Sequence, residues 1–100
     1  MKVKVHSIRF DADKKLLEFV QGRVDKLEHF YDKIIDSEVF LRIDKSSNTD
    51  NKVAEIKMNI PGKELFAKKQ CKSFEEATDT AVDALRRQLK KHKHKSRRTS

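Results

Sequence analysis

A helical pattern of apolar residues fills the segment 12–32 and lies between two segments with strand-like patterns. Asp11 and Asp13 at its start carry the side-chain oxygens that commonly cap a helix N-terminus. A helix that joins two neighbouring strands of one sheet makes those strands parallel, through a right-handed crossover. This segment therefore predicts a strand-helix-strand unit. The residues that recur at three- and four-residue spacing are Leu16, Leu17, Val20, Val24, Leu27, Phe30 and Tyr31.

The strand before this helix is expected at 2–10. Val3 and Val5 alternate with polar residues, but the apolar positions then change parity to Ile8 and Phe10. Because an extra residue in one strand changes which side chains face inward, we expect a bulge or kink near Ser7.

Three further strands are expected after the helix. The first two alternate between apolar and polar residues, which is the period of a strand with one buried face. The facing of the third is left open by the successive apolar residues Leu65, Phe66 and Ala67. The expected bounds are 36–44, 53–60 and 64–71, with a polar loop at 45–52 and a tight turn at Pro61-Gly62.

A second helix is expected from Ser73, which forms a capping box with Glu76. Acidic residues fill its first turns and cations its last, an arrangement that complements the helix dipole. Since each helix has one apolar stripe and each clear strand one apolar face, both helices should pack on the same side of the sheet. The sequence thus predicts an α+β fold of order β-α-β-β-β-α, with a four-stranded mixed sheet.

The composition fits one small domain, because 100 residues with 36% hydrophobic content can bury a single core. The N-terminal residues lack the apolar stretch of a secretion signal, and nowhere do 18 apolar residues follow one another. The single Cys71 cannot form an internal disulfide, which is typical of a reducing compartment. We expect a cytoplasmic protein independent of membranes, with a domain at 1–95 and a basic flexible tail at 96–100.

The net charge of +8 is concentrated at one end of the chain. All 16 acidic residues lie at or before Asp83, where 16 Lys and Arg balance them, and the last 17 residues hold the other eight cations. A neutral body with a cationic end indicates a phosphate-rich partner. A run of charge can also be a solvated face, although such faces normally mix both signs. On a helix, the cations centre on Arg87, Lys90 and Lys91, opposite the ridge of Leu85, Leu89 and His92.

A smaller basic group lies on the first predicted helix, where Arg23 and Lys26 share a face at i,i+3. The same face could be a neutral surface, because Asp25 and Glu28 are close enough in sequence to offset both charges.

Two segments resemble a known family. The segment VDKLEHFYDKI, 24–34, followed by ALRRQLKKHKHK, 84–95, is similar to the short ribosome hibernation promoting factors, also known as ribosome-associated translation inhibitors or sigma-54 modulation proteins. The pattern R-Q-L-x-K at Arg87, Gln88, Leu89 and Lys91 is the most specific part of a resemblance that covers 2–95. It implies a fold related to double-stranded RNA-binding domains.

The resemblance also implies a function for the domain at 1–95: attachment to the small ribosomal subunit, or to the 70S ribosome, through phosphates of 16S rRNA. The bound protein would occupy the space of mRNA and of tRNA in the A and P sites. Carried over by residue, and extended by the helical wheel, the expected rRNA-binding set is Arg23, Lys26, Arg86, Arg87, Lys90, Lys91, Lys93 and Lys95.

Two departures from the family pattern are visible. A Met-Tyr pair common near the start of the second helix is Phe74-Glu75 here, which could change local packing or an rRNA contact. The sequence also ends at Ser100 without the dimerisation domain of the long family members, so we expect no self-dimerisation domain.

Other classes of function fit the sequence less well. No glycine-rich phosphate loop, G-x-S-x-G motif or isolated acid pair is present, so we expect neither an enzyme nor a small-molecule substrate or cofactor. His92 and His94 point roughly 160° apart on a helix, so we expect no metal site. The alternative is a general double-stranded RNA or DNA-associated regulatory protein, which the sequence alone does not separate from a ribosome-binding one.

Overall fold

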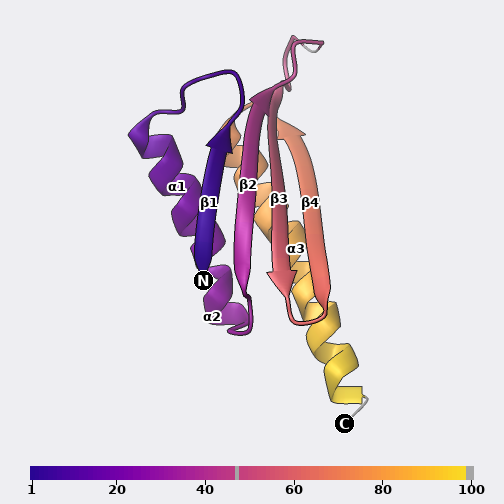
Figure 1. Cartoon of the computed structure of the whole chain (residues 1–100). Coiled ribbons are helices and arrows are strands. Elements are labelled where there is room, and N and C mark those ends of the chain that lie inside the picture. The colour runs from indigo at the N-terminus through magenta and orange to yellow at the C-terminus, as the bar shows by residue number, and fades with distance from the viewer. Residues whose placement is uncertain (47, 99–100) are drawn as a thin grey trace.

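The computed structural model describes residues 1–46 and 48–98, with side chains in the last helix described as far as His94. Four strands and three helices follow one another in the order β-α-α-β-β-β-α (Figure 1). Their bounds are β1 Lys2–Ser7, α1 Lys14–Asp25, α2 Leu27–Phe30, β2 Asp36–Ile43, β3 Lys52–Ile60, β4 Lys63–Cys71 and α3 Phe74–Arg98.

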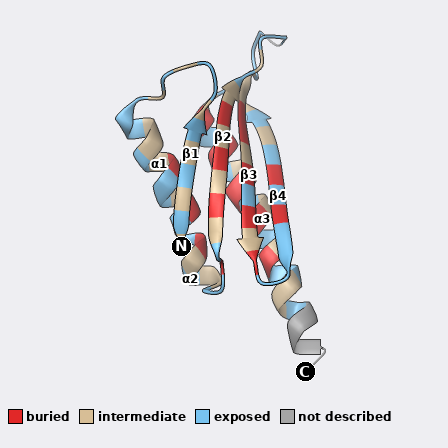
Figure 2. Cartoon of the chain, viewed as in Figure 1, coloured by how far each residue is buried: buried red, intermediate tan, exposed pale blue. Residues whose placement is uncertain are grey.

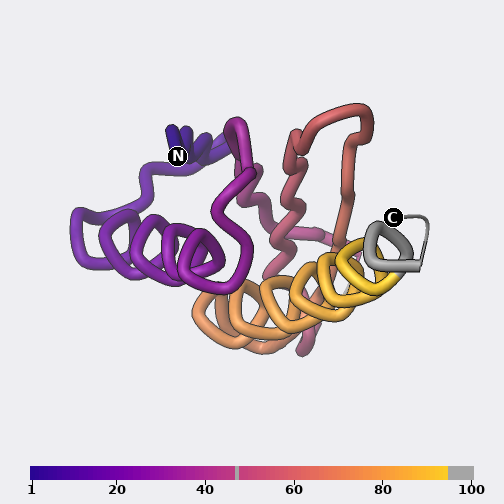
Figure 3. Tube along the Cα trace, turned by 90° about the horizontal axis from the view of Figure 1, so that it is seen from below, coloured from indigo at the N-terminus to yellow at the C-terminus, as the bar shows by residue number. Residues whose placement is uncertain are grey.

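The four strands form one mixed sheet in the order β1-β2-β3-β4. β1 runs parallel to β2, with Val5 opposite Val39, as the crossover predicts. β2, β3 and β4 are joined as antiparallel neighbours, with Val39 opposite Ile56 and Ile56 opposite Ala67. Both long helices lie on the same face of the sheet, as Figure 3 shows, so the predicted fold class is confirmed.

The core lies between this sheet face and the two helices. Most apolar residues of β2, β3 and β4 that face the helices are buried, whereas those of β1 are only half-buried (Figure 2). The opposite face is exposed or half-buried, except at Val53. β4 resolves the question that its sequence leaves open, because Leu65 and Ala67 are 3% and 5% exposed whereas Phe66 is 44% exposed. The largest fully buried apolar side chains are Leu27, Leu41, Ile56, Met58, Leu85, Leu89, Val20, Val24, Val39 and Val53.

The first strand is shorter than predicted. β1 ends at Ser7, and the backbone N–H of Ile8 still donates to the carbonyl of Leu41 at 2.8 Å. Arg9 then takes a left-handed backbone conformation with φ 63°, which lies outside the β region, so the strand does not continue through it. The change of parity in the sequence therefore marks the end of the strand, and the expected strand at 8–10 is wrong.

The first helix is also interrupted. Asp13 caps α1 as predicted, since its side chain accepts a hydrogen bond of 2.8 Å from the backbone N–H of Leu16. The expected continuous helix at 12–32 is wrong, because α1 stops at Asp25 and α2 begins at Leu27. The N–H of His29 donates to the carbonyl of Lys26 at 3.1 Å, three residues back, so the chain tightens there.

The last helix begins as predicted. The backbone N–H of Glu76 donates to Ser73 Oγ at 3.1 Å, which satisfies one free donor of the first turn. The expected flexible tail at 96–100 falls where no side chains are described, although the backbone of α3 reaches Arg98. None of the described helices has the combination of length and apolarity that a membrane crossing requires.

Candidate nucleic-acid interface

Four cations of α3 lie on its exposed side. Arg86, Arg87, Lys90 and Lys91 are all exposed, and none of them forms an ion pair with another described residue. On the opposite side of the same turns, Leu85 and Leu89 are 0% exposed and pack into the core. Because the buried leucines fix the rotation of the helix, the four cations are presented to solvent by a rigid support.

The four cations form two rows within this exposed side. Arg86 and Lys90, four residues apart, lie toward α1 and α2 and each lines a pocket on that side. Arg87 and Lys91 are rotated by about 100° from them, toward β4. Next to this second row, Gln88 joins α3 to β4, since its Nε2 donates to the carbonyl oxygen of Phe66 at 2.9 Å.

The groove between α1 and α3 brings Arg23, Lys26 and Arg86 together. It has a volume of about 400 Å³, and the acidic residues Asp79 and Asp83 also line it. The structure thus unites the smaller basic group of the first helix with one cation of the last helix. Its charge is mixed, in contrast to the exposed side of α3.

Arg23 interacts with other residues of the protein. Its Nε lies 3.0 Å from Asp79 Oδ1 in an ion pair, and this Nε forms no hydrogen bond with any described residue. The guanidinium also lies 4.7 Å from the ring centre of Phe19. The sequence offers Asp25 and Glu28 as the neutralising acids, but the partner of Arg23 is Asp79 of α3, and Glu28 contacts the amino group of Met1. A helical wheel of one segment cannot reveal such a partner.

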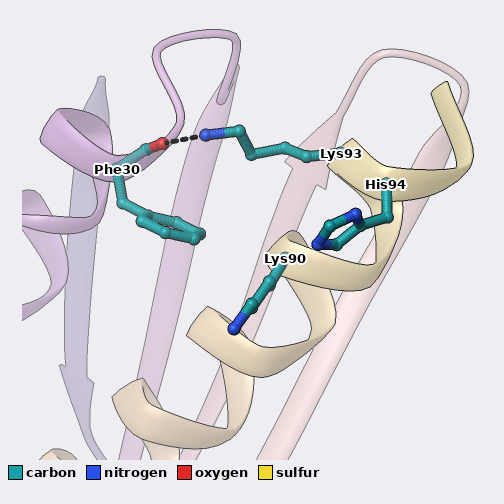
Figure 4. Close-up of a pocket in the computed structure, with 4 residues that line it drawn as sticks. All are labelled: Phe30, Lys90, Lys93 and His94. Atoms are coloured by element: carbon teal, nitrogen blue, oxygen red, sulfur yellow. Dashed lines mark hydrogen bonds between the residues drawn. The ribbon is translucent and has the colours of Figure 1, made fainter. Parts of the chain in front are cut away.

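Lys93 connects α3 to the end of α2 (Figure 4). Its Nζ donates to the backbone carbonyl oxygen of Phe30 at 3.1 Å and lies 4.6 Å from the centre of the Phe30 ring. Phe30 is the last residue of α2, where carbonyl groups lack intrahelical partners and a positive charge is favourable. Next to it, Tyr31 and His92 pack edge to face with ring centres 5.8 Å apart. Lys93 therefore fastens the C-terminal half of α3 to the body.

Replacing Lys93 with methionine tests this fastening. Lys93→Met keeps an apolar stem beside Phe30 but removes the charge and the donor, so we expect a loss of about 1 kcal/mol in unfolding free energy. For a domain of this size that lowers the melting temperature by roughly 4–8 °C. Lys90→Met is the matched control, because Lys90 lines the same pocket without such a bond, and its effect on the melting temperature should be about half as large or less, at most about 2–4 °C. Equal melting temperatures in thermal denaturation would contradict the assigned role.

Lys95, the remaining residue of the predicted set, has a side chain outside the described residues. The other seven lie on α1, on the turn before α2 and on α3, which are the elements that cover one face of the sheet. Two contributors were missed by sequence reasoning: Asp79, which holds Arg23, and Phe30, which holds Lys93. The sequence shows only that Phe30 is apolar, and an apolar residue predicts burial in the core, not contact with a cation.

The family model described as "Sigma 54 modulation protein / S30EA ribosomal protein" matches residues 3–97. The chain is 31% identical over 95 residues to a ribosome hibernation promoting factor of Pseudomonas putida, covering 95% of this chain and 89% of that protein. It is 30% identical over 95 residues to the factor of the same name in Escherichia coli, covering 95% and 96% of the two chains.

Solved structures show the same fold. A ribosomal subunit interface protein from Coxiella burnetii superposes with a TM-score of 0.82 at 19% identity, covering 94% of this chain and 99% of that one. The N-terminal domain of Thermus thermophilus Protein Y gives 0.78 at 22% identity, covering 92% and 99%. The match over nearly the whole chain, together with the arrangement of strands and helices, shows that the chain belongs to the sigma 54 modulation protein / S30EA ribosomal protein family, which includes the ribosome hibernation promoting factors.

Proposed function

We propose that the protein attaches to the small ribosomal subunit through phosphates of 16S rRNA and, once bound, blocks mRNA and the tRNA of the A and P sites. Ribosome hibernation is the function that the name of its relatives gives, and the family is not one of enzymes. The proposed rRNA contacts and the proposed blocking of mRNA and tRNA are supported by the charge and rigidity of α3. Its place of action would be the cytoplasm, where ribosomes work.

The observation that carries the proposal is the group Arg86, Arg87, Lys90 and Lys91 on the exposed side of α3, which forms no ion pair with any described residue. Like charges at i,i+4 cost a few tenths of a kcal/mol per pair, and this group contains two such pairs. An external polyanion removes that repulsion and gains charge-assisted hydrogen bonds, which Arg can make bidentately to a phosphate. Folded RNA is read mainly through its shape and backbone, so no base-reading motif is required.

The remaining basic residues differ in how freely they could contact rRNA. Lys26 lines the groove between α1 and α3 and has no acidic partner among the described residues, so its charge is available. The charge of Arg23 is largely offset by Asp79. Lys93 gives one N–H to Phe30 and keeps the other two donors of its ammonium group. We propose that Arg23 and Lys93 make weaker direct contacts and chiefly hold the two helical supports at a fixed distance.

The blocking of mRNA and tRNA follows from shape. α3 continues past the turn between β3 and β4, so its basic end projects from the sheet (Figure 1). A projecting helix held at two points, by Gln88 on β4 and Lys93 on α2, can enter a groove of rRNA without bending. While it occupies that groove, other polyanions are excluded by contact and by charge.

The salt dependence of binding to purified small subunits tests the electrostatic part of the proposal. With about five or six phosphate contacts, the logarithm of the association constant should fall with the logarithm of salt concentration at a slope of roughly −4 to −5. The measurement is co-sedimentation across a salt series, with a short RNA duplex as the competing ligand. Equal affinity for the duplex and the subunit at each salt concentration would favour a general double-stranded RNA binder and contradict the proposal.

A further inference from the structure

A pocket on the outer face of the sheet, opposite to the helices, is not used by the proposed rRNA contacts. It has a volume of about 550 Å³, which is within the range of small-molecule and peptide sites. Arg42, Val53 and Gln70 form one cross-strand row across β2, β3 and β4 at its base. It lies at the end of the sheet where β2 leads into the segment 44–51, away from the basic end of α3 (Figure 1).

The lining is rich in cations from four separate parts of the chain: Arg9, Arg42, Lys45 and Lys68. Glu55 holds two of them, since its carboxylate pairs closely with Arg42 and lies 4.0 Å from Lys68 Nζ. Arg9 and Lys45 form no ion pair with any described residue. Within the described part of the chain, the pocket therefore keeps two cations without an ion-pair partner.

The one acidic residue of the lining is already engaged. Asp44 accepts hydrogen bonds from Ser46 Oγ at 2.6 Å, from the Ser46 backbone N–H at 3.0 Å and from Gln70 Nε2 at 3.1 Å. These bonds, those from Ser46 first, lower the pKa of Asp44, so its carboxylate stays ionised. Gln70 also donates to the carbonyl of Asp50 at 2.7 Å, which fixes the loop against β4. This wall of the pocket is therefore preformed.

The pocket also has an aliphatic part. Ile8 and Ile43 at its rim are each 39% exposed, and Val53 at its floor is only 1% exposed although it points away from the helices. Covering the two isoleucines would gain roughly 25 cal/mol for each Å² of apolar surface removed from water. Among the described lining residues none is aromatic, so the site offers no surface on which a base could stack.

Arg9 lies in the pocket with a strained backbone. A non-glycine residue at φ 63° is uncommon, and such a conformation costs on the order of 1–3 kcal/mol. Strain of this kind concentrates at binding sites, where it places a side chain that the ligand needs. Glycine would fit this backbone without strain but would remove the guanidinium.

We propose that this pocket binds a short acidic peptide segment of a partner protein, with an aliphatic side chain between Ile8 and Ile43 and carboxylates on Arg9 and Lys45. Recognition of acidic motifs by clustered cations is a common mode of peptide binding. An aliphatic contact next to the cations favours a peptide over a nucleic acid, because the sugar-phosphate backbone carries no aliphatic side chain and the pocket holds no stacking partner. This site is separate from α3 and would act whether or not rRNA is bound.

The test uses the full-length, uniformly ¹⁵N-labelled protein and a blocked hexapeptide of alternating glutamate and leucine. We expect amide shifts at Ile8, Arg9 and Ile43 and a dissociation constant below about 1 mM. Arg9→Gly should weaken binding about tenfold while leaving the melting temperature equal or higher, because glycine accepts the backbone conformation. Arg9→Lys keeps the charge and should stay within about threefold of the unaltered protein.

Three outcomes would overturn the proposal. One is a set of shifts confined to the cations of α3, which would mean general attraction to an anion. Another is unaltered peptide affinity in Arg9→Gly. The third is hexauridine RNA shifting the same pocket amides at lower concentration than the peptide, which would identify a nucleic-acid site. Because the experiment contains no ribosomes, its result does not depend on the proposed rRNA contacts.

Discussion

Arg87→Glu combined with Lys91→Glu is expected to abolish binding to the small ribosomal subunit. Each substitution removes a contact to phosphate worth about 1.5 kcal/mol or more and places a negative charge where rRNA is negative, so the affinity should fall by at least about 100-fold. Both side chains are exposed and make no ion pair among the described residues, so the melting temperature should change by only a few degrees. Co-sedimentation with purified subunits at moderate salt measures the first effect, and thermal denaturation the second.

The matched control is Lys14→Glu combined with Lys15→Glu. It lowers the net charge by the same amount, from +8 to +4, but at the start of α1, far from the C-terminal half of α3 (Figure 1). Lys14→Glu breaks the Lys14–Glu18 pair, but both side chains are exposed and such pairs contribute little, while negative charge in the first turn suits the helix dipole. This variant should therefore stay folded. We expect it to lose at most a few-fold in affinity. If both variants lost binding equally, net charge alone would explain attachment, and α3 would have no special role.

Much of the fold could be predicted from the sequence because the apolar period changes at each element. The parallel first pair, the antiparallel remainder and the packing of both helices on one face all follow from local patterns and connection rules. The break at Lys26 could not be predicted in this way, because no glycine or proline occupies that position and the helical spacing continues through it. The positive φ of Arg9 was equally hidden, since arginine has no particular preference for that conformation.

The exposed cations of the candidate site could also be anticipated, but their individual states could not. In the sequence, Lys93 looks like its neighbours Lys90 and Lys91, yet only Lys93 reaches a carbonyl oxygen of a residue 63 positions away. Arg23 and Lys26 look equivalent on a helical wheel, yet only Arg23 meets an acid of α3. A wheel describes one helix, whereas ion pairs between helices depend on how the sheet spaces them. The structure thus separates the cations that contact a neighbouring helix, Arg23 and Lys93, from those that form no ion pair within the described part of the chain.

Leu89→Ala should lower the stability strongly and leave binding nearly unchanged, which is the reverse of what we expect for Arg87→Glu combined with Lys91→Glu. Leu89 is 0% exposed and lies between Gln88 and Lys90, so its side chain seats the basic part of α3 on the sheet. Truncation leaves a cavity and should cost about 2–5 kcal/mol of unfolding free energy, a large fraction of the 5–15 kcal/mol typical of such domains. The melting temperature should fall by roughly 10–25 °C.

Well below that lowered transition most molecules of Leu89→Ala remain folded with all their cations in place, so subunit binding at about 10 °C should stay within a few-fold of the unaltered protein. Chemical denaturation gives the stability, and co-sedimentation in the cold gives the affinity. We expect separate effects because Leu89 stabilises the folded state that holds α3 on the sheet, whereas Arg87 and Lys91 make the proposed contacts themselves. Binding needs that folded state to be populated, not to have its full stability. A variant that is folded in the cold but fails to bind would show that the exact seating of α3, and not merely its charge, limits attachment.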